Sequence, residues 1–94
     1  MKAGSGFCDK NGHPLQEYDG VLLIESCLIK LSTGECLRVP EGTRATILFL
    51  ISDHGHKCAN LEVYPDETRF GFCDGVDTEK LVFLMTASEK YKDS

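Results

Sequence analysis

The chain has 94 residues, of which 41% are hydrophobic and 27% charged, and 15 acidic against 10 basic residues give a formal net charge of -5. This length suits a single core, and the hydrophobic content is well above that of disordered chains. The basic residues are scattered singly from Lys2 to Lys92. Because such an acidic surface would repel a phosphate backbone, we expect no nucleic-acid partner. The sequence predicts one domain over residues 1–94, with 1–6 as a flexible start and 88–94 as a tail.

Nothing in the sequence indicates export or a membrane. Residues 1–6 precede no apolar run, so we expect no signal peptide. The longest uncharged apolar run, residues 45–52, is too short to cross a bilayer. Five cysteines at irregular spacing cannot all pair within one chain, which favours reduced thiols and a cytoplasmic location.

Turn signals recur roughly every 8 to 12 residues, a rhythm typical of all-β barrels and sandwiches. Asn11-Gly12 predicts a tight turn within residues 7–15, because both positions tolerate positive φ. Residues 20–31 predict one long strand, bent near Glu25 and Ser26. Further strands are expected at 36–39, 43–51, 58–64, 68–73 and 80–87, with a polar loop at 74–79 between the last two.

The C-terminal stretch has two interpretations. Residues 77–79 could cap a helix running to Tyr91, but residues 81–85 are apolar all round rather than striped, which favours a strand. Residues 88–92 would then close as a helical turn. The predicted fold class is therefore all-β, or mainly β with a short C-terminal helical turn, built as a small SH3-like barrel or roll of five to seven strands.

Residues 20–31 are apolar on both faces of the predicted strand. One face would carry Val21, Leu23, Cys27, Ile29 and Leu31, and the other Leu22, Ile24 and Leu28. A small barrel has only one inside, so the second face needs a cover, either the two chain ends or a second copy. We expect a homo-oligomer, a dimer in the simplest case, with Leu22, Ile24 and Leu28 as its ligand or partner surface.

Three short segments follow one another in a recognisable order. Residues 40–43 (PEGT) lead into an apolar strand, and residues 62–66 (EVYPD) and 69–74 (RFGFCD) come before the last apolar stretch. In this order they resemble small bacterial SH3-like barrel domains, over about residues 20–90. About ten extra residues between Phe49 and Leu61 depart from that pattern. The resemblance implies a barrel fold and an interaction role, and it supplies no catalytic residues.

The stretch from Asp53 to Cys58 is the strongest candidate for a metal site. On an extended segment His54, His56 and Cys58 would share one face, and two imidazoles with a thiol suit zinc or copper. Against this, Asp-His-Gly sits where the chain should turn, and Gly55 would scatter the ligands. A solvated hairpin tip is the alternative interpretation, and we expect no cofactor.

Cysteine chemistry has two further candidates. Cys58, beside His56 and Lys57, is the one thiol with a base and a cation near it in sequence, so a small cysteine-dependent enzyme is an alternative function. Gly-Phe-Cys-Asp occurs at 6–9 and again at 71–74, and Cys8 would approach Cys73 if the two copies paired. Chance explains the repeat equally well. The sequence therefore predicts a non-catalytic binding or regulatory module that acts through self-association or through a protein partner, with metal binding and cysteine catalysis as alternatives.

Overall fold

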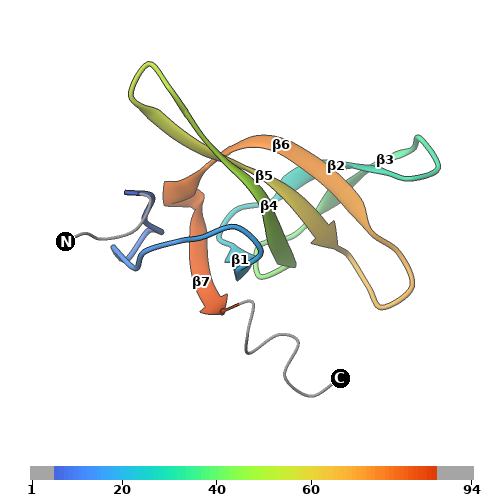
Figure 1. The fold of residues 1–94 in the computed structure, drawn as a ribbon. Coiled ribbons are helices and arrows are strands. Elements are labelled where there is room, and N and C mark those ends of the chain that lie inside the picture. Colours follow the sequence, from blue (N-terminus) through green and yellow to red (C-terminus); the bar gives the residue numbers. More distant parts are fainter. Residues whose placement is uncertain (1–5, 87–94) are drawn as a thin grey trace.

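The structure is a computed structural model, and it describes residues 6–86. Within this range the chain forms seven strands and one 3-10 turn: β1 (Gly20–Leu23), β2 (Cys27–Leu31), β3 (Cys36–Val39), β4 (Arg44–Asp53), β5 (His56–Tyr64), β6 (Gly71–Asp77), η1 (Thr78–Lys80) and β7 (Leu81–Met85). All strand pairs are antiparallel, in the sheet order β3-β2-β6-β5-β4-β1-β7. Figure 1 shows the sheet curled into a half-barrel. The predicted mainly β class is confirmed.

The predicted bend in residues 20–31 divides this stretch into β1 and β2. Although they are consecutive in the chain, three strands lie between them in the sheet. The backbone N–H of Ile24 donates to the carbonyl oxygen of Lys80 at 3.1 Å, and the Lys80 ammonium lies 3.4 Å from the Glu25 carboxylate. The bend is thus tied to the turn before β7, and it joins the two sides of the curled sheet.

Strands β4, β5 and β6 form a meander whose two bulges increase the local twist. The hairpin between β4 and β5 turns through His54 and Gly55, with φ of 51° and 85°. Two residues at positive φ are what a two-residue turn of type I′ requires, so the strands continue to Asp53 and from His56. Both strands are therefore two residues longer at this end than the sequence predicted.

The core lies on one face of the sheet. Its largest fully buried side chains are Leu15, Val21, Ile29, Val39, Ile47, Leu61, Val63 and Leu81. The faces predicted for residues 20–31 are confirmed: Val21, Leu23, Ile29 and Leu31 are buried and Cys27 is half-buried, whereas Leu22 and Ile24 are half-buried and Leu28 is exposed. Side chains therefore alternate between the buried and the opposite face both before and after the bend, as the sequence predicted.

The predicted position of the strand that forms β6 was only partly right. The sequence placed it at 68–73 with a polar loop at 74–79, but β6 covers Gly71–Asp77. Asp66 accepts the backbone N–H groups of Thr68 and Arg69, which keeps that segment in a turn. Further on, the side chain of Asn60 accepts the backbone N–H of Gly75 at 2.9 Å and extends the pairing through polar residues.

The C-terminal stretch is a strand, β7, over Leu81–Met85, as its apolar pattern favoured. Asp77 caps only the 3-10 turn, through the backbone N–H of Glu79. The helical turn expected at 88–92 lies outside the described residues. Within 6–86, no helix is long and apolar enough to cross a membrane.

The N-terminal turn predicted from Asn11-Gly12 is present, with Gly12 at φ 84°. The Asp9 side chain, which is 5% exposed, accepts backbone N–H groups from Asn11 and His13, and also from Phe83 in β7. The ring of His13 stacks on that of Phe83 at 3.9 Å. The N-terminal loop therefore covers the edge of the sheet that β7 would otherwise leave open.

Candidate functional site: the outer face of the sheet

The face of the sheet opposite the core, called the outer face below, carries exposed apolar side chains. Each of five residues exposes between 40% and 57% of its surface, and they are Leu28, Phe49, Ile51, Phe70 and Phe72. Phe72 is opposite Glu62, whose neighbours Leu61 and Val63 are fully buried, so alternation directs Phe72 outward. Monomeric proteins rarely gather large apolar groups on one exposed face without a binding role.

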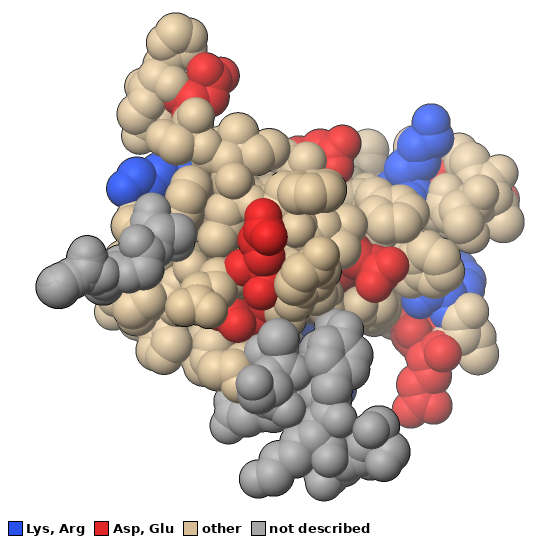
Figure 2. Space-filling model, in the orientation of Figure 1, with Lys and Arg blue, Asp and Glu red and all other residues tan. Residues whose placement is uncertain are grey.

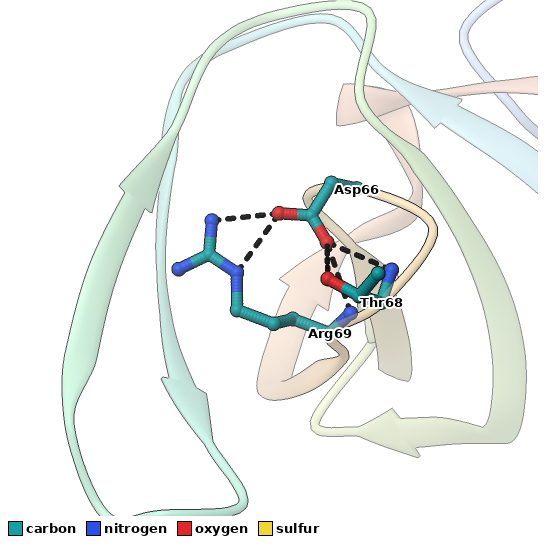
Figure 3. Close-up of polar contacts among 3 residues, drawn as sticks. All are labelled: Asp66, Thr68 and Arg69. Carbon is teal, nitrogen blue, oxygen red and sulfur yellow. Dashed lines mark hydrogen bonds and ion pairs between the residues drawn. The ribbon is translucent and has the colours of Figure 1, made fainter.

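A rigid turn holds Phe70 next to Phe72. One carboxylate oxygen of Asp66 accepts the backbone N–H groups of Thr68 and Arg69 and the Thr68 hydroxyl, all within 2.9 Å. The other oxygen accepts the Arg69 guanidinium at 2.7 and 2.8 Å (Figure 3). These hydrogen bonds, from Arg69 first and then Thr68, hold the pKa of the Asp66 carboxyl well below its usual 3.8. The two phenylalanine rings that follow meet edge to face at 5.6 Å.

A polar network borders the aromatic residues on the β5 side. The hydroxyl of Tyr64 donates to the Glu62 carboxylate at 2.6 Å and lies 2.9 Å from the Thr46 hydroxyl. Figure 2 shows one side of the molecule, where acidic side chains stand in small groups among uncharged ones and the basic side chains lie toward the margins. An apolar centre with a polar border is the usual anatomy of a protein–protein interface.

One row of residues crosses the outer face from β2 to β4. Lys30 is opposite Phe72, Phe72 is opposite Glu62, and Glu62 is opposite Thr46. Phe72 therefore has a cation on one side and an anion on the other. The row has opposite charges at similar positions on either side of an exposed aromatic ring.

The partner surface predicted from the sequence coincides only in part with these residues. Leu28 is one of the five exposed apolar residues, whereas Leu22 lies on β1, which three strands separate from β2 in the sheet, and Ile24 lies in the bend. Sequence reasoning missed Phe49, Ile51, Phe70 and Phe72. The spacing of Phe70 and Phe72 was a usable signal, because residues two apart on a strand share a face.

The three predicted metal ligands lie along one hairpin. His56 and Cys58 are two apart on β5 and share a face, but His54 is in the turn with 92% of its side chain exposed. Within residues 6–86, no three His, Cys, Asp or Glu side chains come together as a potential metal site. The hairpin therefore offers no preassembled three-ligand set in this part of the chain.

The cysteines are all unpaired, and their environments differ. Cys8 and Cys36 are exposed, and Cys58 is half-buried. The sulfur of Cys73 lies 2.8 Å from that of Cys27, so Cys73 has a different thiol partner from the Cys8 suggested by the repeated motif. Burial, with a contribution from Cys27, raises the pKa of the Cys73 thiol to about 12. Such a thiol stays protonated at neutral pH, which is the opposite of what a catalytic nucleophile needs.

No protein-family model, no curated protein and no solved structure gives a significant match to this chain. The functional argument therefore depends on the fold and on the outer face.

Proposed function

We propose that this chain is a non-catalytic binding module that acts as a homodimer, with the outer face of its sheet as the interface. The single observation that carries this proposal is the row Lys30, Phe72 and Glu62 across three neighbouring strands. A two-fold axis running along β6 would stack Phe72 on the partner's copy of the same ring. The same rotation would set each Lys30 opposite the partner's Glu62, which makes the face self-complementary.

The architecture we propose is an SH3-like barrel. Three features support it: the meander β4 to β6, the 3-10 turn that follows β6, and the return of β7 to pair with β1. In such a barrel β1 and β4 are the first two strands, and the hairpin of β2 and β3 is a long insertion between them. This hairpin pairs with β6. Such folds serve many functions, so the proposed role depends on the surface and not on the fold.

The five thiols are unpaired, which supports the cytoplasm as the compartment we propose. The partner that we propose is a second copy of this chain. Its aromatic residues supply the centre of the interface, and the groups around Tyr64 and Glu62 supply the border.

The experiment that tests this proposal is sedimentation of the Phe72→Lys variant. Placing two ammonium groups at the centre of an apolar interface should weaken the dimer at least about 30-fold, as expected for a hot-spot residue. Tyr18→Lys is the matched control. It removes another exposed aromatic residue, one that lies beside Phe7 and Leu50, away from the outer face. Equal dimerisation of the Phe72→Lys variant and the native chain would rule out this interface.

A further inference from the structure

Cys27 and Cys73 bring two sulfur atoms together from distant parts of the sequence. Cys27 is the first residue of β2, opposite Val39, and Cys73 lies on β6, opposite Leu61. Val39 and Leu61, the residues opposite the two cysteines, are both buried, so alternation directs both thiols toward the core side of the sheet. The two side chains are half-buried against the core, and their sulfur atoms are 2.8 Å apart.

The pair remains accessible to small molecules. Both cysteines line a surface hollow whose other members include Glu25, Ser26 and Asp74, and all three of these are exposed. A disulfide requires the sulfur atoms to approach from 2.8 Å to about 2.05 Å. Small side-chain rotations are enough for such an approach when the thiols are already in contact. The hollow therefore combines a preassembled thiol pair with a path for an oxidant.

We propose that Cys27 and Cys73 form a redox-responsive pair, which a small hydroperoxide converts into an intramolecular disulfide joining β2 to β6. In the first step the Cys27 thiolate attacks the terminal peroxide oxygen. The O–O bond breaks, Cys27 becomes a sulfenic acid, and the peroxide leaves as hydroxide or alkoxide, which takes back from the solvent the proton that the Cys27 thiol released and becomes water or an alcohol. In the second step the Cys73 sulfur attacks the Cys27 sulfur. The S–S bond forms, the S–O bond breaks, and the Cys73 proton leaves with the hydroxide as water.

The environment of Cys73 assigns this residue to the second step. Because burial and the neighbouring Cys27 raise the pKa of Cys73 to about 12, Cys73 stays a thiol at neutral pH and waits as the resolving residue. Its contact with Cys27 then favours disulfide formation over further oxidation of the sulfenic acid. A thiol reductant reverses the reaction by thiol–disulfide exchange.

The disulfide would fasten the hairpin of β2 and β3 to the meander. The regular pairing of β2 with β6 covers only Lys30 with Phe72 and Leu31 with Gly71. A bond from Cys27 to Cys73 would extend this attachment to the start of β2. Because it also closes a long loop in the unfolded chain, we expect oxidation to raise the melting temperature by about 10 °C or more.

The test uses the full chain treated with a small molar excess of hydrogen peroxide and then digested for disulfide mapping by mass spectrometry. We expect one dominant peptide pair, containing Cys27 and Cys73, and a higher melting temperature that returns to its starting value with dithiothreitol. The control variant C8S/C36S/C58S keeps only this pair and should behave in the same way. Cys73→Ser should lose both the intramolecular link and the temperature shift.

Two results would overturn the proposal. One is a dominant link that involves Cys8, Cys36 or Cys58 in the native chain, since that would make the contact of Cys27 with Cys73 incidental. The other is sulfinic or sulfonic acid at Cys27 with no internal disulfide. Both readouts come from the native protein, so they hold even if a variant does not fold, and they are independent of dimerisation.

Discussion

The Asp9 carboxylate accepts the backbone N–H of Phe83 at 2.7 Å, across 74 residues of sequence. The same side chain accepts the N–H groups of Asn11 and His13 at 2.9 and 2.8 Å. The backbone N–H of Lys10 also donates to the carbonyl oxygen of Leu81 at 2.9 Å. One short loop thus provides hydrogen-bond partners for backbone groups on the free edge of β7, the edge that does not pair with β1.

Replacing Asp9 with alanine should destabilise the protein by about 2 to 4 kcal/mol, because three backbone donors lose a charged acceptor in a buried position. Urea unfolding followed by circular dichroism measures the change. Lys10→Ala is the matched control. It keeps the backbone bond to Leu81 and should stay within about 0.5 kcal/mol of the native chain. Equal stability of the two variants would contradict the role given to Asp9.

The contribution of Asp9 should depend on pH. Burial raises the pKa of its carboxyl, but the N–H groups of Phe83, His13 and Asn11 outweigh burial and hold the pKa below 3.8. A group with a lowered pKa in the folded state contributes fully above its unfolded value, and the contribution is lost as pH falls through the folded pKa. Native and Asp9→Asn proteins should therefore differ most in stability near neutral pH, and the difference should shrink below about pH 4. A constant difference from pH 7 to pH 2 would contradict this assignment.

Gly71 should tolerate no side chain. A Cβ atom there would lie 2.8 Å from the carbonyl oxygen of Lys30 and 2.9 Å from Cδ1 of Ile29. Gly71→Ala should therefore destabilise the protein by about 1 to 3 kcal/mol through overpacking between β2 and β6. At Gly20 the nearest atom is the flexible Met85 Cγ, at 3.1 Å, so Gly20→Ala should cost less. Denaturant unfolding of both variants tests the ranking, and the reverse order would contradict the close approach of β6 to β2.

A charge exchange tests the proposed geometry of the dimer. Lys30→Glu or Glu62→Lys alone places like charges opposite each other twice in the interface, which should weaken association about 10-fold. The double variant restores opposite charges across the two-fold axis and should recover most of the lost affinity. Fluorescence-monitored dilution measures the three dissociation constants. Additive losses in the double variant would contradict an axis along β6.

Much of the fold could be predicted from local patterns. Alternation in residues 20–31 predicted which side chains are buried, and turn chemistry located most strand ends. The extent of β6 could not be predicted, because three of the residues 74–77 are polar or glycine, and their pairing with Cys58 and Ala59 comes after a bulge where the Asn60 side chain accepts the N–H of Gly75. Local propensity carries no information about such a partner.

The residues of the candidate site were harder to predict from the sequence than the fold. Leu28 was predicted to be on an open face, but the other exposed apolar residues of that face come from β4, from β6 and from the turn before β6, far along the chain. Which exposed residues lie together depends on the strand order, and the extra length of the β4–β5 hairpin obscured that order. The contact between Cys27 and Cys73 depends on the same pairing of β2 with β6.

Sedimentation equilibrium of the untagged, reduced chain over a range of micromolar concentrations tests the central claim most directly. Self-association through the outer face predicts a mass that rises with concentration toward about 21 kDa, twice the 10.4 kDa of one chain. A mass that stays at 10.4 kDa throughout this range would contradict it.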